Sequence, residues 1–256
     1  MRLAHITDLH FGAEEPDVVR GLRDDLGGIN ADRVLVGGDL TMRARDEQFA
    51  AARELLDEIG RPWTSVPGNH DLPLDRPARA YGSLDAYRAF IDREPEPAVR
   101  ENGLLLLGLS SPRPYLWKGG RVDGEQRARI AGEFASAAEL KVLMLHHPVL
   151  RSPQRPRETL VRGAEAAITA AARAGVDVIL CGHDHVAAQA RIGGGMIGVM
   201  SGTACSWRVR AGESQSYTVL DLDGDRLRIT VRHWHDGGFR EARTAEWHRT
   251  SDGWHP

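Results

Sequence analysis

The first two thirds of the chain alternate short apolar runs with longer amphipathic segments. The apolar runs predict strands over residues 2–8, 33–39, 63–69, 103–111, 141–147 and 176–183. Apolar positions at helical spacing predict helices over residues 17–29, 45–59, 124–138 and 159–174. Runs such as 142–145 stay apolar at successive positions, which is typical of strands whose sheet is covered on both faces. The pattern therefore favours an α/β fold.

The pattern changes in the last third of the chain. Strand-like segments separated by turn signals predict mostly β-structure, over residues 187–195, 196–202, 216–222, 226–234 and 239–247. No repeat, low-complexity tract or linker separates this region from the rest. We therefore expect a single domain over residues 1–256, with a motif-bearing α/β part (1–185) and a β-rich part (186–256).

Composition and charge narrow the function only a little. The 256 residues carry a net charge of −3 with both signs spread along the chain, so no electrostatic footprint for nucleic acid or an anionic membrane is visible. Cys181 and Cys205 lie among apolar or small residues, which suits a reduced compartment and argues against a disulfide scaffold. The first ten residues lack a signal-peptide pattern, and the most apolar window, 104–111, is too short to cross a bilayer. We expect a soluble, cytoplasmic protein without a membrane span.

Polar clusters follow the predicted strands at the ends where open α/β sheets bind their ligands. In chain order they are 7-TDLH, 37-GGDL, 68-GNHD, 146-HHP and 182-GHDH. Side chains two residues apart on a strand point the same way, so we expect Asp8 and His10 to converge, and likewise His183 and His185. Carboxylates, an amide and imidazoles without a thiolate form a ligand set that suits Mn²⁺, Fe²⁺/³⁺, Zn²⁺, Co²⁺ or Ni²⁺.

The number of possible ligands indicates two metal ions. One Zn²⁺ takes fewer ligands than the candidates offer, namely Asp8, His10, Asp39, Asn69, His146, His183 and His185. Two divalent ions and two aspartates leave a formal charge of about plus two, which attracts a phosphate oxyanion. Such a pair also lowers the pKa of a bridging water and supplies hydroxide for in-line attack on phosphorus. Gly68 and Gly182 allow close backbone approach to the ions, or simply end strands in ordinary turns.

All five clusters in this order resemble the calcineurin-like metallophosphoesterases. This binuclear family includes bacterial class III cyclic-nucleotide phosphodiesterases, purple acid phosphatases and the SbcD/Mre11 nucleases. The resemblance extends from Ala4 to His185 and implies a four-layer αββα sandwich of two mixed β-sheets flanked by helices, an α/β (α+β) fold. The site is then expected at the strand ends between the sheets, and the β-rich tail is compatible with the second sheet.

The resemblance also implies a role for each site residue. One metal is expected to be held by Asp8, His10 and His185, and the other by Asn69, His146 and His183, with Asp39 bridging them. His70 is expected to be catalytic, by stabilising the phosphoryl oxygens or protonating the leaving group, and Asp71 to orient His70. His147 remains the alternative to His146. Asp184 is expected to point away from the ligands, without an assigned role.

Several other histidines and tryptophans are expected to be structural. His5 is one residue out of phase with Asp8 and His10, so it should face the other side of its strand. Solvated or packing roles are expected for the residues of the C-terminal tail, His233, His235, His248, His255, Trp234, Trp247 and Trp254.

Substrate choice is expected to depend on four loops, over residues 72–82, 112–121, 148–158 and 206–210. Their basic residues suit a phosphorylated or nucleotide-like substrate, although loop arginines are often simply solvated. These are Arg76, Arg79, Arg113, Lys118, Arg121, Arg151, Arg155, Arg157, Arg208 and Arg210. An apolar and aromatic set could stack a base or cover an acyl chain: Tyr115, Leu116, Trp117 and Trp207.

The predicted function is a phosphoesterase that uses two divalent or mixed-valence ions, such as Mn, Fe or Zn, on small phosphodiesters, with 3′,5′-cyclic nucleotides as one candidate. A UDP-diacylglucosamine-type pyrophosphate hydrolase is an alternative, although such enzymes usually depart from the GNHD cluster. An SbcD/Mre11-like DNA nuclease would need a capping domain, and a stable nucleic-acid partner is not expected. A catalytically inactive scaffold should have lost ligands, whereas all are present here. A small homo-oligomer is compatible with the sequence.

Overall fold

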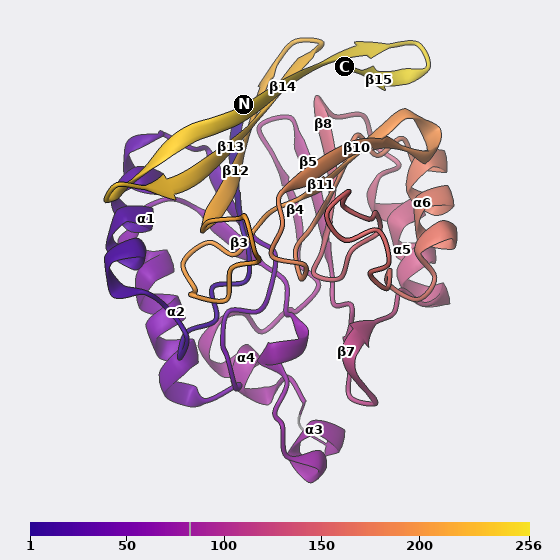
Figure 1. Cartoon of the computed structure of the whole chain (residues 1–256). Coiled ribbons are helices and arrows are strands. Elements are labelled where there is room, and N and C mark those ends of the chain that lie inside the picture. Colours follow the sequence, from indigo (N-terminus) through magenta and orange to yellow (C-terminus); the bar gives the residue numbers. More distant parts are fainter. Residues whose placement is uncertain (82) are drawn as a thin grey trace.

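The computed structural model describes residues 1–81 and 83–256, and within them two β-sheets lie face to face with helices on their outer faces. Figure 1 shows α1 (Pro16–Gly28) and α2 (Asp46–Glu58) on one side, and α5 (Gly124–Glu133) and α6 (Ala164–Arg173) on the opposite side. The short helix α4 (Asp85–Phe90) packs against α2, and α3 (Arg76–Tyr81) projects at the bottom of the view. The predicted four-layer αββα sandwich of two mixed sheets is confirmed.

The first sheet has seven strands in the order β15-β14-β13-β12-β1-β2-β3. Its parallel part is built from the N-terminal strands β1 (Arg2–Ile6), β2 (Arg33–Val36) and β3 (Trp63–Ser65). The C-terminal strands extend this sheet, and each is antiparallel to its neighbour. β12 (Ser216–Asp223) pairs with β1, followed by β13 (Arg226–His235), β14 (Gly238–Thr250) and β15 (Gly253–His255).

The second sheet has six strands in the order β10-β11-β9-β8-β5-β4. Its strands are β4 (Ala98–Glu101), β5 (Leu104–Leu109), β8 (Leu140–Leu145), β9 (Val178–Cys181), β10 (Ala188–Ile192) and β11 (Met196–Met200). The β-rich tail therefore does not form one sheet, since β10 and β11 join this sheet while β12 to β15 join the other. An apolar pattern in the sequence predicts where strands lie but not which strands pair with each other. A separate hairpin is formed by β6 (Pro112–Arg113) and β7 (Leu116–Gly120).

Three apolar clusters correspond to the three interfaces between the layers. One joins the seven-stranded sheet to α1 and α2, a second joins the six-stranded sheet to α5 and α6, and the third lies between the sheets. Along β8, Leu143 and Leu145 face the helices, whereas Val142 and Met144 face the other sheet. Alternate residues of a strand point to opposite faces of the sheet. Because both faces are buried here, residues on either face must be apolar, which explains the uninterrupted apolar runs.

Several element boundaries differ from the predicted ones. The helix expected over residues 159–174 begins only at Ala164, because the preceding Gly163 has a φ of +86° that no helix contains. The helix expected over 124–138 already ends at Glu133. None of the helices in the described ranges is both long and apolar enough to cross a membrane.

Arg79 connects two of the loops beside the site, although it was expected among the substrate-binding arginines. Its guanidinium donates to the carbonyl oxygens of Leu72 (3.3 Å), Pro73 (3.0 Å), Pro114 (2.9 Å) and Leu116 (3.0 Å), and lies over the Trp117 ring. Its side chain is buried, which lowers its pKa. Arg79 therefore fixes the β6–β7 hairpin against the loop that follows residue 71.

We expect Arg79→Met to lower the free energy of unfolding by about 1–3 kcal/mol, because buried carbonyl oxygens lose their donor. Urea unfolding measures this change. The matched control is Arg240→Met, an exposed residue on β14 that should change stability by no more than about 0.5 kcal/mol. Equal stability of the two variants would show that the Arg79 contacts contribute nothing to folding.

Candidate metal centre

The backbone of the polar clusters has an unusual conformation. Five candidate ligands lie in the left-handed region, at φ 54° for Asp8, 50° for His10, 51° for Asp39, 75° for His183 and 58° for His185. This conformation costs roughly 1–2 kcal/mol for a residue with a side chain, and such strain gathers at functional sites. β1 ends at Ile6 and β9 at Cys181, so the expectation that strand alternation aligns each pair is wrong. Left-handed turns beyond the strands bring the ligands together instead.

Two glycines permit the close approach of these turns. A Cβ atom at Gly182 would lie 2.6 Å from Asp8 Oδ2, and one at Gly68 would overlap the Asp39 carboxylate. Any side chain at either position would therefore displace a candidate ligand. Close approach, rather than an ordinary turn, explains both glycines.

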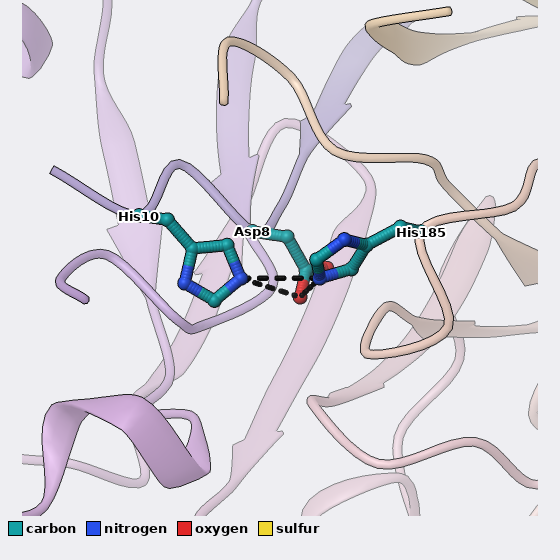
Figure 2. A group of neighbouring side chains, drawn as sticks. All are labelled: Asp8, His10 and His185. Carbon is teal, nitrogen blue, oxygen red and sulfur yellow. Dashed lines mark hydrogen bonds and ion pairs between the residues drawn. The ribbon is translucent and has the colours of Figure 1, made fainter. Parts of the chain in front are cut away.

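The first group of ligands consists of Asp8, His10 and His185 (Figure 2). Asp8 Oδ1 lies 3.1 Å from His185 Nε2 and 3.6 Å from His10 Nε2, and the two Nε2 atoms are 3.1 Å apart. The Nδ1 atoms face carbonyl oxygens, of Thr41 for His10 (3.3 Å) and of Arg208 for His185 (2.6 Å). A carbonyl only accepts, so each Nδ1 carries the proton and each Nε2 presents a lone pair toward the other ring.

The two oxygens of Asp8 have different surroundings. Oδ2 accepts hydrogen bonds from Thr7 Oγ1 (2.8 Å) and from the His183 amide (2.9 Å). Oδ1 is buried and has no hydrogen-bond partner. A buried acceptor without a donor is costly, and facing lone pairs repel, whereas a cation among them removes both penalties. Burial also lowers the pKa of His10 to about 4, which keeps the ring in the neutral form that binds metals. The donor set fits a divalent ion.

The second group consists of Asp39, His146 and His183. Asp39 Oδ2 lies 3.3 Å from His146 Nε2, which is itself 3.3 Å from His183 Nδ1. The same oxygen is 3.7 Å from His10 Nε2, so it faces both groups. Burial lowers the pKa of His146, but the Asp39 and Asp8 carboxylates outweigh burial and bring it to about 10. A positive charge is therefore strongly favoured at this position.

Asn69 presents an unpaired oxygen, whereas the imidazole of His147 already has a hydrogen-bond partner. Asn69 begins the short helix η1 (Asn69–Asp71), and its Oδ1 is buried without a hydrogen-bond partner, like Asp8 Oδ1. His146 Nδ1 faces the Gly37 carbonyl oxygen at 2.8 Å, which leaves Nε2 toward Asp39. His147 Nδ1 instead lies 2.8 Å from Ser111 Oγ. The structure thus places His146 beside Asp39 and His183, while Ser111 engages His147.

His70 lies beside the first group, with its ring centroid 4.8 Å from that of His10. The expectation that Asp71 orients His70 is wrong, because His70 Nδ1 faces the Met42 carbonyl oxygen at 2.9 Å. The Asp71 carboxylate instead accepts from the amides of Leu40, Thr41 and Gly68 at 2.8–3.2 Å. Asp71 therefore holds the turn before Asn69 against the loop that carries Asp39. Burial and the nearby Asp39 raise its pKa to about 7.

The residues expected to be structural belong to none of the ligand groups. His5 is buried between the sheets with Nδ1 2.8 Å from Ser201 Oγ. Cys181 and Cys205 are buried free thiols, and burial raises the pKa of Cys181 to about 12. Trp247 and Trp254 belong to the core between the sheets, and Trp234 packs against the cluster beneath α1 and α2.

A cavity of about 450 Å³ opens above the ligands. Asp39, Asn69, His70 and both histidines of the GHDH cluster line it, and basic residues from three of the predicted loops complete it, namely Lys118, Arg155, Arg208 and Arg210. Asp184 also lines the cavity, with its carboxylate grouped with His183 and Glu158, so it does not point away from the ligands as expected.

The other predicted loop arginines have different positions. Arg113 donates to the Asp123 carboxylate (2.9 Å) and to the Ser110 carbonyl oxygen (2.6 Å), so it braces its own loop. The side chain of Arg76 and residue Gly82 lie outside the described part of the chain. Thr7, which supports Asp8, was not predicted, and only its position directly before Asp8 could have indicated it.

Comparison with known proteins agrees with this geometry. The model of the calcineurin-like phosphoesterase family matches residues 1–187. A probable cyclic nucleotide phosphodiesterase of Synechococcus sp. is 26% identical over 201 residues, which cover 73% of this chain and 74% of that protein. A glycerophosphodiester phosphodiesterase of Enterobacter lignolyticus is 35% identical over 82 residues, 28% of this chain and 30% of that protein.

A solved structure shows the same fold. The purple acid phosphatase of yellow lupin superposes with a TM-score of 0.71 at 16% identity, covering 95% of this chain and 53% of the lupin chain. This chain thus spans about half the length of that phosphatase. Because the family match covers residues 1–187, which include every candidate ligand, this chain belongs to the calcineurin-like phosphoesterase family.

Proposed function

We propose that this chain hydrolyses small phosphodiesters at a binuclear metal centre. Asp8, His10 and His185 would hold one ion, and Asn69, His146 and His183 the other, with Asp39 shared. The observation that carries this assignment is Asp39 Oδ2, which faces His146 Nε2 at 3.3 Å and His10 Nε2 at 3.7 Å, one residue from each group. The buried oxygens without partners on Asp8 and Asn69 support one ion beside each.

The protein residues around the ions have separate tasks. Bound divalent ions would supply Lewis acidity to a phosphoryl group and acidify a water molecule. His70 donates from Nδ1 to the Met42 carbonyl oxygen, so its Nε2 is the atom available at the cavity. From there it can exchange a proton with a leaving-group oxygen, and its position is fixed by the bond from its amide to Asp39 Oδ1 (2.8 Å).

We propose diesters of nucleotide or glycerol size as substrates, with 3′,5′-cyclic nucleotides as the first candidate. The cavity volume of about 450 Å³ lies in the usual range for small-ligand sites, and its basic residues complement a phosphate. Two relatives bear names of phosphodiesterases, one for cyclic nucleotides and one for glycerophosphodiesters. The whole chain would act as one unit, since β12 to β15 pair with the sheet that carries Asp8.

Metal analysis and a substrate panel test this function together. We expect close to two transition-metal ions per chain, and Mn²⁺-dependent hydrolysis of an aryl diester, cyclic AMP or a glycerophosphodiester that stops on chelation and returns on adding metal. An aryl monoester, a UDP-sugar pyrophosphate and single-stranded DNA complete the panel. Exclusive hydrolysis of the pyrophosphate or of DNA would contradict the proposed substrate class, and a folded protein that binds no metal would contradict the site itself.

A further inference from the structure

Arg208 places a cation directly above the candidate metal centre. Its Nη1 atom lies 3.2 Å from His70 Nε2, 3.2 Å from His10 Nε2 and 3.3 Å from His10 Nδ1. Met42 Sδ is a further neighbour at 3.5 Å. Within the described residues no carboxylate lies within ion-pair distance of this guanidinium, so Arg208 forms no salt bridge. The Asp8 and Asp39 carboxylates lie beyond the His10 ring that it contacts.

The backbone of Arg208 fixes where this cation lies. Its carbonyl oxygen accepts from His185 Nδ1 (2.6 Å), and its amide donates to Ser206 Oγ (3.0 Å). The same residue therefore orients a candidate ligand through its main chain and presents its side chain to the cavity. It follows residues 1–187, the part that the family model matches, so the family match says nothing about it.

The histidine contacts leave most of the guanidinium unsatisfied. A guanidinium only donates, and His10 Nδ1 already carries a proton for Thr41, so that nitrogen cannot accept. His10 Nε2 is the atom proposed to hold an ion, which takes up its lone pair. The remaining acceptor is His70 Nε2, because His70 Nδ1 donates to Met42. A half-buried guanidinium whose acceptors are one imidazole nitrogen and one thioether sulfur keeps donor capacity for a ligand that brings oxygens.

The other cavity arginines are engaged elsewhere. Arg155 pairs with Glu158 and lies 3.8 Å from the Asp184 carboxylate. Arg210 Nε donates to the Asp184 carbonyl oxygen at 3.0 Å. Of the three arginines, Arg208 is the one that reaches His70 and the first group of ligands.

We propose that Arg208 is a substrate-contacting residue that donates to a nonbridging oxygen of the bound phosphoryl group, next to His70. This proposal rests on the proposed phosphoesterase function. The planar fork of a guanidinium matches two phosphate oxygens, whereas an ammonium acts as a point charge, so lysine should replace it only in part. On binding, the phosphoryl oxygen takes the place of the histidine nitrogens that Arg208 contacts in the free protein.

The experiment compares Arg208→Met and Arg208→Lys with the metal-loaded wild type. The first readout is binding of inorganic phosphate, by calorimetry and as an inhibitor, and the second is kcat and KM for an aryl diester. We expect Arg208→Met to weaken phosphate binding about 10- to 100-fold with metal content unchanged, and Arg208→Lys to fall between it and the wild type. Arg240→Met, exposed on β14, is the matched control.

Different outcomes separate this proposal from the function on which it rests. Unchanged phosphate affinity in a metal-loaded Arg208→Met variant would overturn the role of Arg208 while leaving the phosphoesterase function intact. Loss of metal in both variants would also overturn the proposed role of Arg208. The main chain of residue 208 holds His185, so a side chain that only contacts substrate should not affect metal binding. A wild type that neither binds metal nor hydrolyses any phosphoester would instead contradict the proposed function.

Discussion

Replacing Asp39 with asparagine is expected to abolish turnover and to reduce bound metal below two ions per chain. The substitution keeps the shape of the side chain but removes the negative charge from the oxygen that faces His10 and His146. Residues outside the coordination sphere of a metal typically contribute 10- to 100-fold to affinity or activity, so a shared ligand should contribute more than about 100-fold in kcat/KM. Metal analysis of the purified variant and steady-state kinetics on an aryl diester measure both effects.

Folding must be separated from chemistry in this variant. Asp39 Oδ1 accepts from the His70 amide, and an asparagine oxygen can keep that bond, so the metal-free variant should still fold and unfold in one cooperative thermal transition. Asp223→Asn, on the exposed end of β12, is the control and should retain full activity. An Asp39→Asn variant with two bound ions and wild-type kinetics would exclude Asp39 as a shared ligand.

Replacing His70 with alanine is expected to lower kcat by roughly 10² to 10⁴ while both ions stay bound, the range for loss of a positioned proton-transfer group. The reason is geometric. The amide and Nδ1 of His70 contact the ligand loops, whereas its Nε2 lies at the cavity beside Arg208, where a bound substrate would meet it. Kinetics and metal content, measured on the same preparations, distinguish a chemical role from a ligand role.

A second variant tests whether the loss of rate comes from the missing Nε2 atom. His70→Asn retains a donor that can reach the Met42 carbonyl oxygen but lacks the distal nitrogen, so it should be as slow as His70→Ala. His248→Ala, an exposed histidine on β14, should leave the rate unchanged. Recovery of most activity in His70→Asn would show that His70 acts by bracing the Met42 loop rather than through Nε2.

The sequence correctly placed Asp71 next to the candidate site but assigned it the wrong hydrogen-bond partner. Its position next to His70 in the GNHD cluster suggested a partner for the imidazole. In the folded chain its carboxylate turns toward three amides of two loops, because those amides would otherwise be buried without acceptors. Adjacent residues share a backbone but point in different directions, so adjacency alone does not identify a partner.

The loop arginines also show that position in the sequence does not identify a contact partner. Arg79, Arg113 and Arg208 all lie in segments that the sequence predicts as loops around the site. Arg79 binds four carbonyl oxygens, Arg113 pairs with Asp123, and Arg208 lies above the candidate ligands. Which of them meets a substrate depends on the packing of loops against one another, which no local pattern records.

The sequence by itself determined the order of the longer strands and helices, the chemical type of the ligands and their place beyond the strand ends. It did not predict the short elements α3, α4, β4, β6, β7 and β15. These follow from local rules: apolar periodicity, the chemistry of carboxylate and imidazole side chains, and the position of each cluster after an apolar run. The continuous apolar strands also indicated layers covered on both faces, which the three apolar clusters confirm.

The tertiary structure decided everything that depends on distance between remote segments. His10 and His185 are 175 residues apart in sequence, yet their Nε2 atoms lie 3.1 Å from each other. They meet because parallel strands of two sheets end at one edge and because left-handed turns, not strand alternation, aim the side chains. The division of the C-terminal strands between the sheets and the position of Arg208 over His70 are set in the same way, by pairing and packing energies that no stretch of sequence contains alone.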